Sequence, residues 1–452
     1  MAQMPNIIYL NSHDTGRYIQ PYGYDIDTPH LQALAEQGVL FRNCHCAAPT
    51  CSPSRASLMT GQYPHNNGMF GLAHRGHQLN DYSATLSAML AGQGYQTAAW
   101  GMAANHCSNV GGTEGAELMG YTTFIDGPLD DAVAFVTTQH DAPFFLSCSW
   151  GLTHRGGKSG PEGFGAEPDH KRYDPRYTIP PEILPDTPAG REDWAWFCSA
   201  ASELDRQMGA IITAVDQAGL SDTTLMIATT DHGVPFPGMK CSLTKHGTGV
   251  FLVMRGPGGF LGGQAIDHMV SHLDLWPTIC ELVGVDCPDR LDGTALGPAL
   301  GDESRPIHDE LIAEVTYHAA YEPKRMLRTD RYVYCRRFGS RRQPVLPNCD
   351  RSLSKDQWLQ AGWADQREAD EELFDTMFDP QERHNLAGNP RYEHILAEYR
   401  ERLDNWMQRS SDPMLAGSVP LPEGGFTTVA DERDPPGPRR IHQGAPNHQR
   451  IR

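Results

Sequence analysis

The first 300 residues alternate short apolar runs with longer amphipathic runs, and this alternation limits the chain to a small set of folds. The apolar runs have the length of buried strands, and the runs between them have the spacing of helices. Strands that alternate with helices predict an α/β fold with a mainly parallel central sheet flanked by helices. We expect strands at residues 6–10, 95–100, 143–149, 224–230 and 250–254, and helices at 29–38, 83–92 and 193–218.

Polar clusters follow four of the expected strands. They read NSHD at 11–14, GMAANH at 101–106, WGLTH at 150–154 and DHG at 231–233. In open parallel sheets, ligands gather at the carboxyl ends of the strands. The four clusters therefore predict a single site at one edge of the sheet.

The pattern changes near residue 300. Strand-like runs at 311–315 and 332–337 have no long helix between them, and a helical run follows at 391–408. We therefore expect a core domain at 1–300 and a smaller α+β domain at 301–411. The tail at 412–452 is rich in proline and glycine, and we expect it to wrap the surface or to be partly disordered.

The formal net charge of -19 argues against a partner of duplex nucleic acid, which requires basic surface. It does not exclude an anionic substrate, because only the field inside a pocket matters for one.

The N-terminal MAQMPNIIYL lacks the features of a signal peptide, and no run approaches the roughly 18 apolar residues of a membrane span. The eleven cysteines are odd in number and scattered. We expect a cytoplasmic protein with reduced thiols and no membrane partner; the oligomeric state stays open.

The segment TCSPSRASLMTG at 50–61 carries a further cluster. Ser52 is the expected N-cap of a helix that ends at Gly61. Cys51 then lies at the helix N-terminus, where free N–H groups and the helix dipole favour an anion. Arg55 lies four residues later, on the same helix face. The segment predicts a nucleophile position beside a guanidinium and an anion-binding helix end.

The run CSPSR followed by ASLMTG resembles the signature of the sulfatase family. The resemblance continues through GQYPHNNGM, DHGVPFPGMK, AEVTYHAAYEPKR and EELFDTMFDPQERHNLA, and it spans most of the chain. The NNGM and PFP segments resemble in particular the branch that contains heparan N-sulfatase. The resemblance implies an alkaline phosphatase-like core at 1–300 that serves as the catalytic sulfatase domain.

In that family a separate maturase reads C-x-P-x-R and oxidises the cysteine to formylglycine. The hydrated aldehyde offers two hydroxyl groups: one oxygen attacks sulfur, and the other later expels sulfate as the aldehyde re-forms. A thiolate could not do this. The resemblance therefore implies Cys51 as formylglycine, a divalent metal ion, a small sulfated substrate and a formylglycine-generating maturase as partner.

The resemblance also implies the metal ligands. Asp14, Asp231, His232 and the matured residue 51 would form the set. His13 stands where many relatives carry a first aspartate, and it either binds the metal or faces the substrate. The family favours calcium, but an imidazole in place of a carboxylate shifts the preference toward manganese.

The sulfate group has its own expected partners. Lys240 follows the PFP segment, where relatives place a lysine or arginine near the sulfate, and Lys245 is a rival for this role. Arg55 is expected beside the sulfate. His154 is expected to contact the sulfate or to act as general acid toward the leaving atom.

The segment WGMAANH at 100–106 departs from the family pattern. Relatives usually show G-K-x-H here, with both the lysine and the histidine in the pocket. Met102 occupies the lysine position, and His106 lies two residues later than expected. Either His106 reaches the pocket from a longer loop or that contact is absent.

Three residues of the smaller domain are expected at the rim of the substrate pocket: Glu314, His318 and Arg325. Together these features predict hydrolysis of a sulfate ester or sulfamate on a sulfated sugar, with N-sulfated glucosamine as one specific candidate. Two alternatives stay open. One is a phosphonate monoester or phosphodiester hydrolase with the same site, and the other is a catalytically silent, ligand-binding relative.

Overall fold

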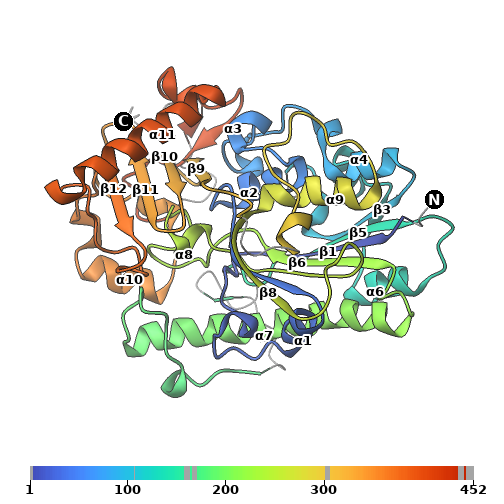
Figure 1. Ribbon diagram of the computed structural model, residues 1–452. Helices are drawn as coiled ribbons and strands as arrows, with labels where there is room; N and C mark the ends of the chain where they lie inside the picture. The colour runs from blue at the N-terminus through green and yellow to red at the C-terminus, as the bar shows by residue number, and fades with distance from the viewer. Residues whose placement is uncertain are drawn as a thin grey trace.

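The structure is a computed structural model that describes residues 4–105, 107–156, 163–164, 171–300, 306–435 and 442–443. Eight strands form a central sheet in the order β4-β3-β5-β1-β6-β7-β2-β8 (Figure 1). Strand β7 runs antiparallel to both neighbours, whereas the other pairs are parallel, so the expected α/β fold is confirmed. The strands are β1 (Asn6–Ser12), β2 (Val39–His45), β3 (Gln96–Gly101), β4 (Thr123–Ile125), β5 (Phe144–Ser149), β6 (Thr224–Thr230), β7 (Leu252–Arg255) and β8 (Gln264–Ser271).

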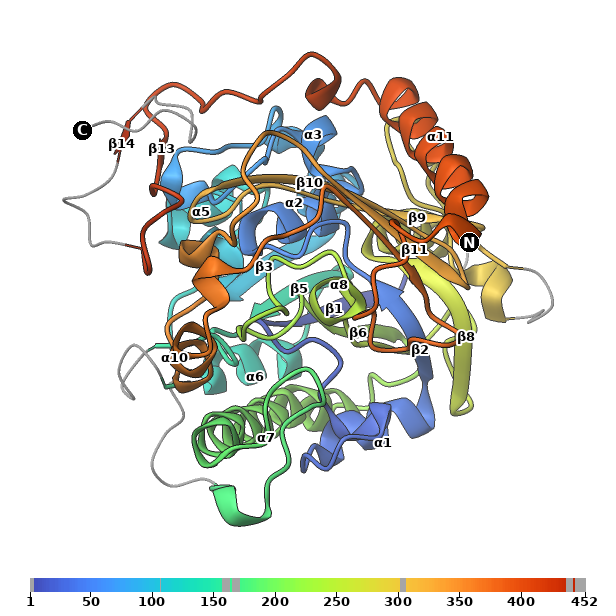
Figure 2. The ribbon, with the colours of Figure 1, turned by 90° about the vertical axis from the view of Figure 1, so that its left-hand side faces the viewer.

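Helices cover both faces of this sheet (Figures 1 and 2). Successive side chains of a strand point to opposite faces. In β1, Ile7 and Tyr9 therefore pack with α2, α4 and α9, whereas Ile8 and Leu10 pack with α1, α6 and α7. The helices of this region are α1 (Pro29–Gln37), α2 (Cys51–Thr60), α3 (Pro64–Asn67), α4 (Leu86–Gly92), α5 (Gly112–Leu118), α6 (Leu129–Thr137), α7 (Pro188–Gln217), α8 (Lys245–Thr248) and α9 (Leu275–Val283).

A second sheet of four antiparallel strands follows, in the order β12-β11-β10-β9. Its strands are β9 (Leu311–Tyr317), β10 (Tyr321–Arg328), β11 (Tyr332–Arg337) and β12 (Glu371–Asp375), and two helices accompany them, α10 (Leu353–Gln360) and α11 (Glu393–Arg409). One face packs on α11, through Tyr334 against Leu403, and the other reaches Leu243 of the core. The small α+β unit is as expected; the exact domain boundaries stay a prediction.

The chain after α11 returns across the smaller unit toward the core. The backbone N–H of Thr428 donates to Ala319 O at 2.8 Å, and Pro435 reaches the central pocket. Strand β13 (Phe426–Thr427) pairs with β14 (His442–Gln443). Among the described residues, no helix is both long enough and apolar enough to cross a bilayer.

Helix α2 begins two residues earlier than the sequence predicts. Its N-cap is Thr50, with extended backbone, and Cys51 is the first helical residue. The predicted Ser52 cap is wrong, because the Ser52 hydroxyl accepts instead from the backbone N–H of Ala73 at 3.1 Å. The predicted end is right: Gly61 has φ 67°, a left-handed conformation that glycine adopts without strain.

Candidate functional site

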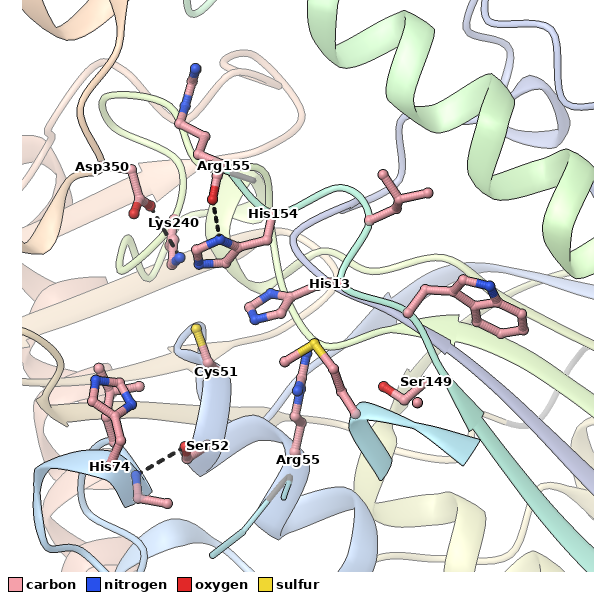
Figure 3. A pocket seen from close by; sticks show the side chains of 18 of the residues that line it. His13, Cys51, Ser52, Arg55, His74, Ser149, His154, Arg155, Lys240 and Asp350 are labelled. Atoms are coloured by element: carbon pink, nitrogen blue, oxygen red, sulfur yellow. Dashed lines mark hydrogen bonds and ion pairs between the residues drawn. The ribbon is translucent and has the colours of Figure 1, made fainter. Parts of the chain in front are cut away.

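The strand order places the polar strand ends side by side. Strands β3, β5, β1 and β6 are consecutive in the sheet, so the segments that follow them meet at one edge. The segments after β3, β5 and β1 line a pocket of about 930 Å³ at the N-terminus of α2. The smaller unit closes part of it, since His318, Ala319 and Asp350 are among its lining residues (Figure 3).

Five side chains at this edge bring their donor atoms within 4.8 Å of one another: His13, Asp14, Cys51, Asp231 and His232. Asp14 and Asp231 are fully buried. Burial alone would raise the pKa of each carboxyl group, but the neighbouring histidines and the cations beside them lower it, so both are ionised. Two buried carboxylates that face one another require cations to stabilise them.

His232 presents a lone pair to this cluster. The Nδ1–H of His232 donates to Gly233 O at 2.9 Å, which leaves Nε2 as an acceptor 3.2 Å from Asp14 Oδ1. This buried Nε2 has no hydrogen-bond donor. Two acceptors that face each other at this distance fit a cation bound between them. His13 Nδ1 lies 2.6 Å from Asp14 Oδ1, and burial lowers the pKa of His13 to about 3, which favours the neutral imidazole that binds metals.

Cys51 belongs to this cluster and also lines the open pocket, as His13 does (Figure 3). Burial raises the pKa of its thiol, and the nearby Asp14 and Asp231 raise it further, against the opposing effect of Lys240. The unmodified side chain is therefore a neutral thiol near pH 7. A neutral thiol is a poor nucleophile, so unmodified Cys51 is not suited to attack a substrate.

Two cations flank the cluster. Arg55 approaches Asp231 Oδ2 with Nε and Nη2, each at 3.1 Å. Lys240 Nζ lies 2.9 Å from Asp14 Oδ2 and 3.1 Å from Asp350 Oδ2. Burial alone would lower the pKa of Lys240, but these carboxylates hold it well above its usual value. Its rival Lys245 begins α8 and lies instead in a second pocket with Tyr18 and Tyr24, so Lys240 is the lysine at this site.

His154 stands at the mouth of the site. Its Nδ1 lies 2.6 Å from the carbonyl oxygen of Arg155, which only accepts, so Nδ1 carries a proton. Its Nε2 lies 4.0 Å from Asp14 Oδ2, and its side chain is 37% exposed. The ring also contacts His13, with ring centroids 4.4 Å apart. His154 can therefore hold or release a proton at Nε2 on the pocket side.

Two of the three predicted rim residues are not in the pocket. Glu314 and Arg325 are directly opposite each other on β9 and β10, and Arg325 also pairs with Asp412 at 2.5 Å. Glu314 accepts from the backbone N–H and from the ring of His65, each at 2.8 Å. All four side chains are buried, so the prediction of substrate contact for Glu314 and Arg325 is corrected to a structural ion-pair cluster.

This cluster also has the geometry of a metal site, because one donor atom each of His65, Glu314 and Asp412 lies within 4.8 Å of the others. Arg325 already supplies the positive charge there, since it pairs with both carboxylates. The third predicted rim residue, His318, does line the central pocket, as does Met102 at the position where a lysine is usual. His106 lies outside the described residues.

Sequence reasoning missed five charged or basic pocket residues: His74, Arg75, Arg155, Glu203 and Asp350. Burial alone would raise the pKa of Asp350, but Lys240 lowers it to about 2. Asp350 follows no strand, so no pattern marked it. Arg75 and His74 had a signal, because GLAHRGH at 71–77 continues the NNGM segment and places basic side chains between glycines.

Comparison with known proteins gives a consistent result. Residues 5–285 match the family model described as Sulfatase. The chain is 30% identical to N-sulphoglucosamine sulphohydrolase of Homo sapiens, with 98% of this chain and 96% of that protein covered. It is 25% identical to Delta 4,5-hexuronate-2-O-sulfatase of Bacteroides thetaiotaomicron, with 91% and 90% covered. The solved structure of BT1596, a 2-O GAG sulfatase, superposes with a TM-score of 0.70 at 22% identity, over 92% of this chain and 94% of that one.

Proposed function

This chain belongs to the sulfatase family of sulfuric ester hydrolases, and we propose that it removes a sulfate group from a sugar through a formylglycine made from Cys51. The observation that carries the proposal is the meeting of Cys51, Arg55 and Lys240 with two buried carboxylates at one end of a pocket. Its relatives include enzymes named for N-sulphoglucosamine and for hexuronate 2-O-sulfate, which supports a sulfated sugar as substrate.

Cys51 becomes the proposed nucleophile only after it is modified. The raised pKa of the Cys51 thiol argues against a thiolate mechanism. The sequence CSPSR retains the residues that a maturase reads in this family. As formylglycine hydrate, residue 51 would supply an oxygen nucleophile and a way to release sulfate by re-forming the aldehyde. Its place at the start of α2 directs the dipole and the free N–H groups of the helix toward the bound anion.

The cluster fits a divalent cation. The orphaned Nε2 of His232 and the ionised Asp14 and Asp231 offer lone pairs to a common point, and His13 and residue 51 lie within reach of it. When bound, the cation would polarise the sulfate oxygens and favour the ionised nucleophile. The mixed oxygen and nitrogen donors suit manganese as well as the calcium that the family favours.

Arg55 and Lys240 would hold the sulfate oxygens. Each now pairs with a carboxylate of the cluster, Arg55 with Asp231 and Lys240 with Asp14, so each cation is already oriented toward residue 51. Hydrogen bonds between charged groups are the stronger kind. Donors that are fixed before the substrate binds need little reorganisation as charge develops.

His154 would serve the leaving group. With Nδ1 committed to the Arg155 carbonyl, the proton that it can exchange is at Nε2, on the pocket side. A sugar oxygen or nitrogen that departs from sulfur needs a proton, and a histidine is suited to supply one near neutral pH. His154 is therefore assigned the general-acid role, with its Nε2 4.0 Å from Asp14 Oδ2.

The test is sulfate release by protein co-produced with a maturase, measured on glucosamine N-sulfate, a 2-O-sulfated hexuronate and an aryl sulfate. We expect release from at least one sugar, with loss of activity in Cys51→Ala. Hydrolysis of a phenyl phosphonate monoester is measured in parallel. It distinguishes a sulfatase from a phosphonate monoester hydrolase, because the same site could bind a singly charged phosphonate ester. Efficient phosphonate hydrolysis beside no sulfate release would overturn the proposed substrate class. Metal-loaded, matured protein without any turnover would point to a silent ligand-binding relative.

A further inference from the structure

Arg75 is a buried cation with no carboxylate partner among the residues that the structure describes. It ends a short helical turn, Ala73–Arg75, on the wall of the central pocket, and it is 7% exposed. No carboxylate of the described chain lies within ion-pair distance of it, and its Nε has no hydrogen-bond partner. Burial lowers its pKa to about 10. Buried charges in proteins are normally paired, because an isolated charge loses its hydration. Arg75 therefore differs from the other cations at this site.

Neutral groups hold Arg75 in position. Nη1 donates to Ala319 O at 3.0 Å and to Thr428 Oγ1 at 3.2 Å, and the guanidinium lies 5.3 Å from the ring centre of Phe426. Ala319 belongs to the turn between β9 and β10, and Thr428 to the segment that returns after α11. Two segments of the smaller unit thus fix a charged side chain of the core domain against the pocket, although neither supplies an acid.

Two histidines share this wall. His318 is buried, its Nδ1 has no hydrogen-bond partner, and burial together with Lys240 and Arg75 keeps its pKa well below the usual value. His74 precedes Arg75 and is exposed to the pocket. In Figure 3, His74 lies on the other side of Cys51 from His13. This wall thus combines one guanidinium with two imidazoles, whose pKa values burial lowers, and the unpartnered Nδ1 of His318 offers a polar atom to a ligand.

The pocket is also larger than a sulfate group requires. Its volume of about 930 Å³ has room for a sugar of more than one ring. The cations expected to hold the reacting sulfate, Arg55 and Lys240, already have carboxylate partners. The unpaired charge lies elsewhere on the wall, so it is available to another part of the same substrate.

We propose that Arg75, with His318 and His74, forms a second anion subsite, which binds a carboxylate or an additional sulfate of a sugar whose reacting sulfate lies at residue 51. This inference rests on the proposed sulfatase function and specifies its substrate class: sugars with at least two anionic groups. A guanidinium suits either group, because its planar fork matches two oxygens of a carboxylate or sulfate.

The experiment compares substrates that share one reacting sulfamate and either carry or lack a second anionic group. Three probes share one reacting group: glucosamine N-sulfate, glucosamine N,6-O-disulfate and a disaccharide of N-sulfoglucosamine and a hexuronate. For each two-anion probe, kcat/KM is divided by that of glucosamine N-sulfate. We expect Arg75→Gln to lower at least one ratio roughly ten- to a hundredfold. A fall for the disulfate alone assigns the subsite to sulfate, and a fall for the disaccharide alone assigns it to carboxylate. Unchanged ratios for both overturn the proposal.

Three controls keep the result interpretable. Arg75→Lys retains the positive charge but not the planar guanidinium, and it should lower the kcat/KM ratio less than Arg75→Gln does. His318→Gln removes the second member of the subsite and should lower the same kcat/KM ratio. Arg290→Gln removes an exposed arginine that does not line the pocket, and it should leave the ratio unchanged. If Arg75→Gln fails to fold, Arg75→Lys and His318→Gln carry the test, and unchanged ratios in both overturn the subsite.

Binding separates this proposal from the proposed function. Unmatured protein, which still carries Cys51, is titrated calorimetrically with the same three probes. We expect the two-anion probe to bind at least tenfold more tightly than glucosamine N-sulfate, with this preference lost in Arg75→Gln. Such binding without turnover after maturation would reject the sulfatase mechanism but keep the subsite. Turnover of sulfated sugars with no preference for a second anion would keep the sulfatase mechanism but reject the subsite.

Discussion

Lys240 Nζ lies 2.9 Å from Asp14 Oδ2 and thereby links a cation that lines the pocket beside Cys51 to a carboxylate of the predicted metal cluster. The same amino group reaches Asp350 of the smaller unit at 3.1 Å. Lys240 thus contacts both a carboxylate of the predicted metal cluster and a carboxylate that the smaller unit contributes to the pocket. This arrangement gives the first prediction.

Lys240→Ala is expected to lower kcat/KM on an aryl sulfate about a hundredfold or more. The loss removes a charge-assisted contact to the sulfate, worth about 1.5–3 kcal/mol, and leaves Asp14 and Asp350 without their shared cation. Lys245→Ala is the matched control, because Lys245 lies in a different pocket and should change kcat/KM little. Steady-state kinetics decide between the two lysines. A nearly wild-type Lys240→Ala beside an inactive Lys245→Ala would contradict this assignment.

The second prediction concerns metal content. Asp14→Asn and Asp231→Asn should each lose the bound ion, because anionic oxygens dominate the affinity for hard cations. His13→Ala should reduce metal content less if His13 only supports the carboxylates, since its Nδ1 lies 2.6 Å from Asp14 and 3.2 Å from Asp231. Elemental analysis of the purified variants measures this directly. Full metal content in Asp231→Asn would exclude Asp231 from the ligand set.

The third prediction concerns Met102, which lines the pocket where relatives carry a lysine. Met102→Lys should strengthen inhibition by inorganic sulfate about tenfold, because a charge-assisted hydrogen bond to the anion becomes available. Met102→Leu, which keeps the side chain apolar and of similar size, should leave sulfate inhibition unchanged. The inhibition constants are measured with one aryl sulfate. Equal constants for Met102→Lys and Met102→Leu would show that this position does not reach the sulfate.

The fourth prediction concerns stability at the contact between the core and the smaller unit. Both ring nitrogens of His65 face acceptors, Glu314 at 2.8 Å and Ser410 O at 3.2 Å, so the ring is bound as the imidazolium. Burial alone would lower the pKa of His65, but Glu314 raises it above its usual value. The pair therefore stabilises the fold fully below the unfolded pKa of about 6.5. This stabilisation is lost as the pH rises through the higher folded pKa.

His65→Gln should therefore lower the free energy of unfolding by about 2 kcal/mol at a pH near 6, and by clearly less at a pH near 9. His394→Gln, on the exposed face of α11, is the control and should have little effect at either pH. Urea unfolding at the two pH values provides the measurement. An equal effect of His65→Gln at both would mean that the charged form of His65 does not stabilise this contact.

The sequence predicted the central sheet and the strand-end cluster for a common reason. Strands buried on both faces are nearly continuous apolar runs, and their polar continuations must meet where parallel strands end. His13 and Asp231 could therefore be predicted together although they are far apart along the chain. Their side chains do meet, with His13 Nδ1 3.2 Å from Asp231 Oδ2.

The smaller unit was less predictable because pairing there is antiparallel. The sequence predicted Glu314 and Arg325 as exposed residues that contact the substrate. The hairpin register instead places them opposite each other and buries both. Asp350 lies in an irregular segment and Arg75 in a short helical turn, and only tertiary contacts bring them to the pocket. Neither periodicity nor strand order determines the position of such residues.

The proposed sulfatase mechanism depends most on the chemical state of residue 51, because the neutral Cys51 thiol cannot supply the proposed nucleophile. The most direct measurement is the mass of the peptide that contains residue 51, taken from preparations made with and without a maturase and assayed for sulfate release. Conversion to formylglycine lowers the peptide mass by about 18 Da. We predict that sulfate release rises in proportion to the converted fraction and is absent in Cys51→Ala. Full activity in protein whose residue 51 is entirely unmodified cysteine would contradict the mechanism.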